Sequence, residues 1–145
     1  MANFNIEIKG AEDVLGRIER VAFLVSKKDE ITQILAEGTA IIRDSVKARA
    51  PLGVTGNLKA SIISKPLVVK ASMPAVAIAA INYKIGPHVH LVEYGHRIVH
   101  GKGGKSTGRV RSHPFFWFGV KASVNSAYVH VQQKIIQLIE QGFSK

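Results

Sequence analysis

The sequence contains no cysteine, which excludes both a disulfide framework and a thiolate metal site. This absence fits a protein that folds in a cytosol. Long apolar runs are also missing, because the longest, residues 75–81, is far shorter than the roughly 20 residues that cross a bilayer. Residues 1–5 lack the basic and apolar regions of a signal peptide, so we expect neither secretion by that route nor a role in a membrane.

Acidic residues are scarce after the first third of the chain. The 145 residues carry a formal net charge of +10. Residues 1–44 hold eight acidic and six basic residues, whereas residues 45–145 hold fourteen basic residues against only Glu93 and Glu140. Such a basic segment indicates a polyanionic neighbour, which is nucleic acid, a membrane surface or an acidic protein. A solvated basic face that aids solubility is the alternative.

Residues for catalysis are also lacking. A nuclease needs clustered carboxylates to hold Mg²⁺, but aspartate occurs only at Asp13, Asp29 and Asp44, all in segments with helical periodicity. Glu93 next to His90 is interpreted as a satisfied structural pair rather than an acid–base pair. No serine has a visible base and orienting residue. The sequence therefore predicts a protein that is not an enzyme and has no cofactor.

Histidines near one acidic residue leave a metal site open as an alternative. On a strand, His88 and His90 would share one face, and Glu93 and His96 follow closely. Three histidines and a carboxylate are ligands that zinc accepts. The helical spacing of zinc hydrolases is absent, so surface or interface histidines are the favoured interpretation.

Hydrophobic periodicity predicts an α+β fold, with a small, mainly antiparallel sheet packed by two long helices in one domain that spans residues 1–145. Helices are expected at residues 11–26, 29–50 and 116–142, with a single helical turn at 57–61. Strands are expected at residues 3–9, 62–70, 75–83 and 89–94, with a turn at 71–74. The terminal helix would be about 40 Å long, so we expect part of it to contact another subunit.

Residues 96–113, before the terminal helix, contain four glycines, no acidic residue and no periodicity, which predicts a long mobile loop. Residues 103–107 resemble the end of a phosphate-binding loop, but Val99 stands where that motif requires glycine and no helix is expected after Lys105. No nucleotide site is therefore predicted. The basic residues of this loop are expected to face DNA or a neighbouring subunit: Arg97, Lys102, Lys105, Arg109 and Arg111.

Four consecutive aromatic residues, 115–118, open the terminal helix. Aromatic side chains can stack on single-stranded bases. Four in a row at a helix start are instead interpreted as core or subunit-interface packing, with at least two of them in the core.

Three spaced motifs resemble one family. Residues 49–62, R-A-P-L-G-V-T-G-N-L-K-A-S-I, resemble its signature of A-P followed by T-G-x-L-x-x-S-I, residues 92–95 resemble its V-E-[FY]-G element, and residues 114–116 resemble its P-F-[LF] element. The family is that of the neck, head–tail joining or tail-completion minor structural proteins of long-tailed bacteriophages. The motif positions are Pro51, Thr55, Gly56, Leu58, Ser61, Glu93, Gly95, Pro114 and Phe115.

These motif residues suit a scaffold. Pro51 ends a helix, Gly56 is expected at positive φ, and Thr55 or Asn57 is expected to cap the helical turn that follows. Leu58 and Ile62 would hold this turn against the core. Glu93 is expected to meet a basic residue, Arg43 or Arg49, of the same or a neighbouring subunit.

The resemblance implies a structural subunit of the virion, assembled in the host cytoplasm, in a ring at the head–tail junction through which DNA passes. Its partners would be further copies of itself, head-connector proteins and tail-tube or tail-terminator proteins, with loose, non-specific contact to DNA. Three alternatives stay open: a tail-terminator ring, a sequence-independent DNA-binding protein, and a small metal-dependent hydrolase built on His88, His90, Glu93 and His96.

Overall fold

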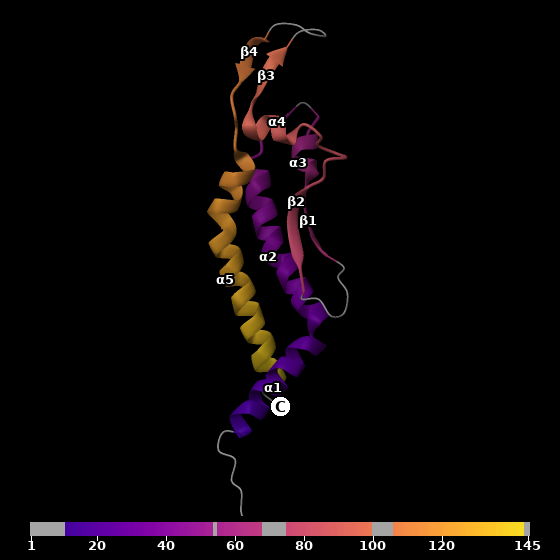
Figure 1. Cartoon of the computed structure of the whole chain (residues 1–145), viewed down its shortest axis with the longest axis vertical. Coiled ribbons are helices and arrows are strands. Elements are labelled where there is room, and N and C mark those ends of the chain that lie inside the picture. The colour runs from indigo at the N-terminus through magenta and orange to yellow at the C-terminus, as the bar shows by residue number, and fades with distance from the viewer. Residues whose placement is uncertain (1–10, 54, 68–74, 100–105, 144–145) are drawn as a thin grey trace, which may run out of the picture.

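A computed structural model describes residues 11–53, 55–67, 75–99 and 106–143. These residues form an elongated α+β molecule with the long axis vertical in Figure 1. In chain order the elements are α1 (Ala11–Ser26), α2 (Lys28–Arg49), α3 (Asn57–Ser61), β1 (Ile62–Pro66), β2 (Ala77–Ile81), α4 (Val89–Tyr94), β3 (His96–Val99), β4 (Ser106–Val110) and α5 (Phe115–Phe143). The predicted fold class is confirmed.

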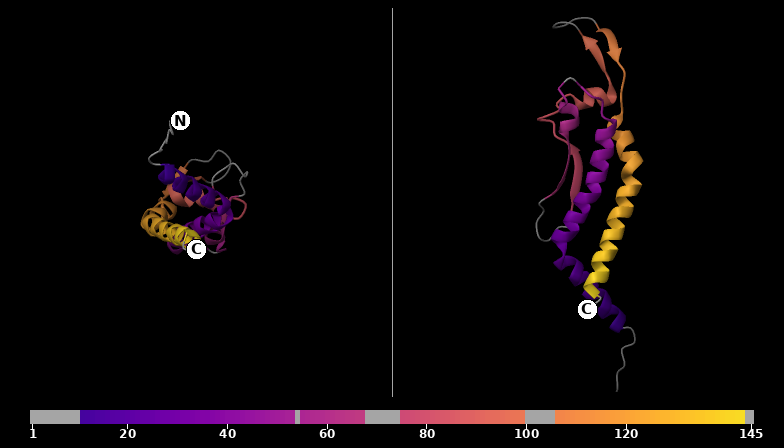
Figure 2. Two further views of the ribbon diagram at one scale, coloured as in Figure 1. Left: turned by 90° about the horizontal axis from the view of Figure 1, so that it is seen from below. Right: turned by 180° about the vertical axis from the view of Figure 1, so that it is seen from behind.

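The two long helices and the first sheet form three layers. Helix α2 lies between α5 on one side and the β1–β2 sheet on the other, as both side views show (Figures 1 and 2). The helix ends lie within one or two residues of those predicted, because the apolar stripe of each helix and Pro51 mark them in the sequence. The hairpin β3–β4 and helix α1 lie at opposite ends of the molecule.

Small residues let α2 and α5 approach each other closely. A Cβ atom added to Gly119 of α5 would lie 2.6 Å from the Cα of Val46 in α2, and one added to Gly38 of α2 would overlap the side chain of Val131. Ser123 and Ala127 continue this buried face of α5 at intervals of four residues. Small side chains at these positions leave room for the two helices to pack closely, whereas Val124, one residue beyond Ser123, is 44% exposed.

The first sheet is a two-stranded antiparallel pair. Its register joins Ile62 to Ile81 and Pro66 to Ala77. The N–H of Leu67 donates to the carbonyl of Val76 at 2.9 Å and extends the ladder by one step. Pro66, which has no N–H to donate, lies at the end of its strand. The predicted strand at 3–9 and turn at 71–74 lie outside the described residues.

Two sequence predictions are wrong. Residues 89–94 form the short helix α4 and no strand, with Val89 and Glu93 buried four residues apart on one face. Within the predicted loop at 96–113, residues 96–99 and 106–110 instead pair as the antiparallel hairpin β3–β4, in which Arg97 is opposite Arg109, while residues 100–105 lie outside the described residues. All of β4 is exposed, so no face of this strand needs alternating apolar residues, and the sequence carries no periodic signal there.

The buried core lies where α2, β1, α4 and α5 meet. Five side chains form it, each at most 4% exposed: Val46, Ala50, Ile62, Val89 and Phe115. Phe116, Val120 and Leu58 pack against this cluster and stay partly exposed. At least two of the four consecutive aromatics were expected in the core, but only Phe115 is buried there; Phe116 packs against the core, and Trp117 and Phe118 are more than half exposed.

Candidate assembly site

The first motif forms a tight turn between α2 and β1. Helix α2 ends at Arg49, and Gly56 occupies the N-cap position of α3 with φ at 67°, which confirms the expected positive φ. The predicted cap by Thr55 or Asn57 is wrong, because no side chain caps α3. The Thr55 hydroxyl instead accepts a long hydrogen bond, 3.4 Å, from the N–H of Asn57. A left-handed residue at the cap leaves the turn dependent on glycine.

Ser61 and Ile62 hold this turn in the core, and both are fully buried. The Ser61 hydroxyl donates to the carbonyl of Leu58 at 2.7 Å, and the Ser61 carbonyl accepts from the N–H of Asn82 at 2.7 Å. Gly86 lies so close that an added Cβ would be 2.6 Å from the Ser61 oxygen. The expected role of Leu58 and Ile62 is confirmed. The sequence analysis did not identify Gly86, because its contact comes from a segment 25 residues away.

Glu93, from the second motif, caps the helix that the third motif begins. Glu93 is 8% exposed, and its carboxylate accepts from the backbone N–H groups of Phe116, at 3.0 Å, and Trp117, at 3.1 Å. The first N–H groups of a helix have no partner within the helix, and its N-terminus attracts negative charge. Two backbone donors thus satisfy a buried carboxylate and join α4 to α5.

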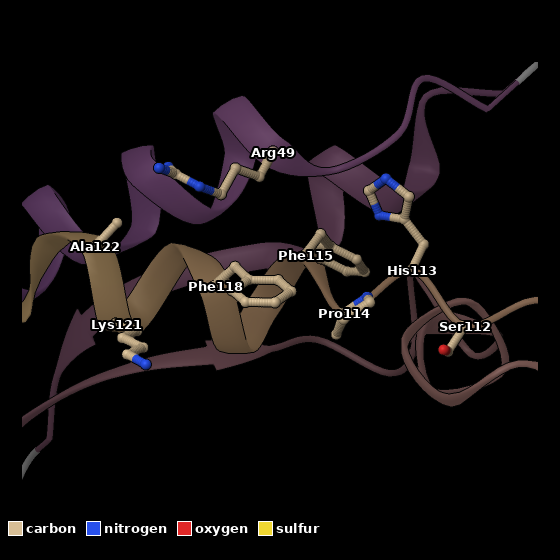
Figure 3. A pocket seen from close by; sticks show the side chains of 8 residues that line it. All are labelled: Arg49, Ser112, His113, Pro114, Phe115, Phe118, Lys121 and Ala122. Carbon is tan, nitrogen blue, oxygen red and sulfur yellow. The ribbon is translucent and has the colours of Figure 1, made fainter.

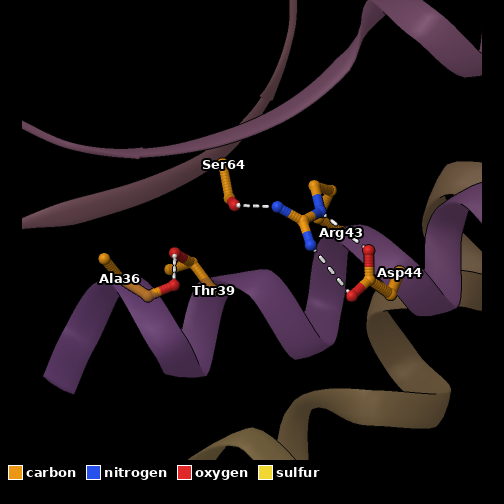
Figure 4. Close-up of polar contacts among 5 residues, drawn as sticks. All are labelled: Ala36, Thr39, Arg43, Asp44 and Ser64. Atoms are coloured by element: carbon orange, nitrogen blue, oxygen red, sulfur yellow. Dashed lines mark hydrogen bonds and ion pairs between the residues drawn. The ribbon is translucent and has the colours of Figure 1, made fainter. Parts of the chain in front are cut away.

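Within one copy, Glu93 does not pair with Arg43 or Arg49 as expected, while a pairing with a neighbouring subunit stays a prediction. Arg43 donates to the Asp44 carboxylate at 2.7 and 2.9 Å and to the Ser64 hydroxyl at 3.2 Å (Figure 4). The hydrogen bond from Arg43 is the main reason that the pKa of Asp44 is lowered. Arg49 donates to the hydroxyl of Ser45 at 2.9 Å. Both arginines therefore interact with residues other than Glu93.

Gly95 connects the end of α4 to the hairpin. Its φ is 71°, and an added Cβ would lie 2.5 Å from the carbonyl oxygen of Val110 and 2.8 Å from the nitrogen of Ser112. The N–H of His113 donates to the carbonyl of Val92 at 2.8 Å. Both ends of the hairpin are thus fixed to α4, so the body of the molecule determines the direction in which the hairpin projects.

The hairpin carries basic residues without acidic neighbours. Arg97, Arg109 and Arg111 are exposed, while Lys102 and Lys105 lie outside the described residues. Arg97 and Arg109 are direct cross-strand partners, so their side chains share one face of the hairpin. Like charges at directly opposite positions destabilise a strand pair. An anionic partner would remove this repulsion.

The residues considered for a metal site do not converge. Both carboxylate oxygens of Glu93 are used in capping α5. The ring of His90 lies 6.5 Å from that of Tyr83, and Nδ1 of His96 is 3.5 Å from the carbonyl oxygen of Leu91. In the described part of the chain, no three histidine, aspartate or glutamate residues are placed to hold a metal ion. Ser106 begins a strand, so the helix that a phosphate-binding loop requires does not follow Lys105.

An open pocket of about 720 Å³ lies beside the start of α5 (Figure 3). Arg49 reaches it from the end of α2, and Phe118 and Lys121 line it from α5. The complete lining is Arg49, Ser112, His113, Pro114, Phe115, Phe118, Lys121 and Ala122. Two cationic groups beside an exposed aromatic ring suit an acidic and apolar segment of a protein partner. The sequence did not indicate this pocket, and its only signal was an aromatic residue in excess of what the core needs.

Comparison with known proteins identifies the chain's relatives at the family level. The model of the HK97-gp10_like family, described as "Bacteriophage HK97-gp10, putative tail-component", matches residues 12–95. This range contains the first two motifs, the turn after α2 and the glutamate of α4. No curated protein and no solved structure matches the chain. Within the described ranges, no helix combines the length and the apolarity needed to cross a membrane.

Proposed function

Because the chain belongs to the HK97-gp10-like family of bacteriophage tail components, we propose that it is a structural subunit of a ring at the head–tail junction. DNA passes through this ring, and the ring contacts head-connector proteins on one side and tail-tube or tail-terminator proteins on the other. The subunit is not an enzyme. It acts in the virion after assembly in the host cytoplasm.

The way the three motifs fit together supports a scaffold role. The carboxylate of Glu93, the most buried one that the structure describes, accepts the hydrogen bonds that cap α5. The hydroxyl of Ser61 donates the hydrogen bond that closes the turn before β1. Among the described residues, every buried side-chain nitrogen and oxygen has a hydrogen-bond partner. A catalytic group needs a perturbed, accessible position, whereas these groups are fully engaged. The motifs therefore hold α3, α4 and α5 together so that the hairpin can project.

The basic hairpin at one end of the elongated body gives the main support for this proposal. Its cross-strand pair Arg97–Arg109 repels itself unless an anion lies nearby. In a ring, the hairpin of each subunit contacts either an acidic neighbouring protein or the phosphates in the lumen. We favour the protein neighbour, because a hairpin fixed at both ends by Gly95 and His113 can dock with little loss of conformational entropy.

Removing the positive charge of the hairpin tests this role. Arg97, Lys102, Lys105, Arg109 and Arg111 are changed to serine together, and head–tail joining is assayed in particles. We expect separate heads and tails, with the affinity for DNA little changed. As a matched control, Arg97, Arg109 and Arg111 changed to serine are compared with Lys59, Lys65 and Lys84 changed to serine, which removes the same charge elsewhere. Normal infectious particles carrying all five substitutions would contradict both versions of the hairpin's role.

A second candidate, a sequence-independent DNA-binding protein, is also favoured by the hairpin's charge. It predicts binding to any duplex, with log affinity falling against log salt at a slope of up to about −4.5 if five phosphates are neutralised.

The shape of particles that lack the chain separates the tail-terminator alternative from the neck role. If the chain is a tail terminator, we expect its loss to leave tails of uncontrolled length; if it is a neck subunit, we expect its loss to leave tails of normal length without heads.

A further inference from the structure

Helix α1 exposes its apolar stripe to solvent. Five side chains on one side of it are between 55% and 70% exposed: Val14, Leu15, Ile18, Val21 and Val25. Four of them follow spacings of four, three and four residues, which is the pattern of a helix seam that packs against another helix. The helix is held to the body near its end, where the ring of Phe23 lies against Gly142 of α5. Among the described residues of one copy, none covers the stripe itself.

Helix α5 also has more apolar surface than its contact with α2 uses. Six of its apolar side chains are between 44% and 68% exposed: Trp117, Phe118, Val124, Tyr128, Val129 and Ile136. Its 29 residues include only three with a full charge, Lys121, Lys134 and Glu140. A helix that is apolar around most of its circumference is normally buried on more than one side. At 100° per residue, the six exposed side chains form two adjacent lines on the side away from Gly119, Ser123 and Ala127.

We propose that α1 of one copy packs between these two lines on α5 of a neighbouring copy. The contact rests on the proposed ring, because a closed ring is built from two different patches on each subunit. Pairing of α1 with α1 would use one patch twice and stop at a dimer. The lengths are compatible, since the α1 stripe, about 17 Å long, fits within the exposed part of α5 from Trp117 to Ile136, which is about 29 Å long.

The charges of the two helices are complementary. Glu12, Asp13 and Glu19 accompany the stripe of α1, and Asp13 already pairs with Arg17 at 2.9 Å in the same helix. Lys121 stands on α5 between the two lines, whereas Lys134 lies on the side of α5 that faces α2, in a groove with Glu30 and Glu37. Opposite charges beside an apolar contact favour one orientation and disfavour pairing of like surfaces.

Disulfide trapping tests the contact directly, because the wild-type chain has no cysteine. Val21→Cys is combined in turn with Val124→Cys, Val129→Cys and Ile136→Cys, and mild oxidation is followed by non-reducing electrophoresis. We expect at least one pair to give a ladder of linked dimers, trimers and larger species. A link within one copy is not expected for Val129, which is thirteen residues and about 20 Å along α5 from Gly142, where α1 is held. A disulfide needs Cα atoms within about 7 Å.

Ser126→Cys with Val21→Cys is the matched control. Ser126 is exposed and lies between Val124 and Val129 along α5, but it points in a different direction from both. It should therefore give no ladder. A ring seen in particles together with no ladder from any of the three pairs would overturn this contact and leave the proposed function standing. Ladders of equal yield from Ser126 would overturn it as well. Absence of the chain from particles would contradict the proposed function itself.

A charge placed on the stripe gives an independent readout. Ile18→Asp is expected to weaken self-association by at least about tenfold in light scattering, with an unchanged Tm of the isolated subunit. Arg20→Asp, on the opposite side of α1, is expected to leave self-association unchanged. Equal association of wild type and Ile18→Asp, or a wild-type chain that remains monomeric at all concentrations, would overturn the contact.

Discussion

At the scale of single residues, the capping of α5 by Glu93 is the connection on which the three motifs depend. The sequence predicted that Glu93 is structural, but within one copy its partners are not the arginines that were expected. Its partners are the backbone N–H groups of Phe116 and Trp117, more than twenty residues away along the chain. Backbone donors are present at almost every residue, so no sequence pattern points to them. We expected an arginine as the partner because charged side chains, unlike free backbone donors, can be read directly from a sequence.

Loss of this cap should destabilise the fold. Glu93→Ala leaves two helix-terminal N–H groups without their acceptor and is expected to cost about 1–3 kcal/mol, measured by chemical denaturation. Glu93→Gln, which keeps the volume and one good acceptor, should cost less. Glu12→Gln on exposed α1 serves as the control and should change stability by under about 0.5 kcal/mol. Equal stability of Glu93→Ala and wild type would show that the cap does not hold the motifs together.

Two glycines with nearly equal φ separate backbone strain from steric overlap. An added Cβ at Gly56 meets no atom within 4 Å, whereas at Gly95 it would overlap the Val110 carbonyl. Gly56→Ala should therefore cost only the strain, about 1–3 kcal/mol. Gly95→Ala should cost clearly more and disturb the base of the hairpin. Equal losses in Tm for the two variants would contradict this account of Gly95.

At the scale of elements, the long helices were predictable and the short elements were not. α1, α2 and α5 have apolar stripes over four or more turns, and a proline or glycine marks several of their ends. α4 is six residues long, and its β-branched residues favoured a strand. β3 and β4 are stabilised by pairing with each other while their side chains stay in solvent, so alternation never arises.

Because α2 and α5 approach each other closely, we expect alanine at a glycine between them to destabilise the fold and alanine at a helical glycine without close neighbours to stabilise it. At Gly119, Ala would place a methyl group against the backbone of Val46 and should destabilise by about 1–3 kcal/mol. At Gly16 of α1, Ala meets nothing within 4 Å and should stabilise by about 0.5–1 kcal/mol through helix propensity. Thermal unfolding compares the two variants. A Gly119→Ala variant as stable as Gly16→Ala would mean that the two helices are not tightly packed.

At the scale of the whole molecule, the uneven charge of the sequence corresponds to two ends of an elongated body. Helix α1, with three acidic and two basic residues, lies at one end, and the basic hairpin lies at the other. The sequence predicted this asymmetry and an anionic neighbour. It did not indicate that the apolar stripe of α1 faces solvent, because a stripe covered within one copy and a stripe covered by another subunit have the same pattern. That residues 1–145 form a single domain stays a prediction.

The absence of a carboxylate cluster predicts that the protein has no nuclease or phosphatase activity with Mg²⁺, Mn²⁺ or Zn²⁺. The purified chain is assayed with each ion, with His90→Ala and Glu93→Ala as controls. Turnover that disappears in His90→Ala, while that variant keeps the wild-type Tm, would contradict the structural role.

The central claim is that copies of this chain form a ring at the head–tail junction. Electron cryomicroscopy of purified particles, with the neck reconstructed without imposed symmetry, tests it most directly. We expect a closed ring of copies of this fold between the head and the tail tube, with each basic hairpin against a neighbouring protein or the DNA. Particles whose neck contains no density for this fold, and which lack the chain by mass spectrometry, would contradict it.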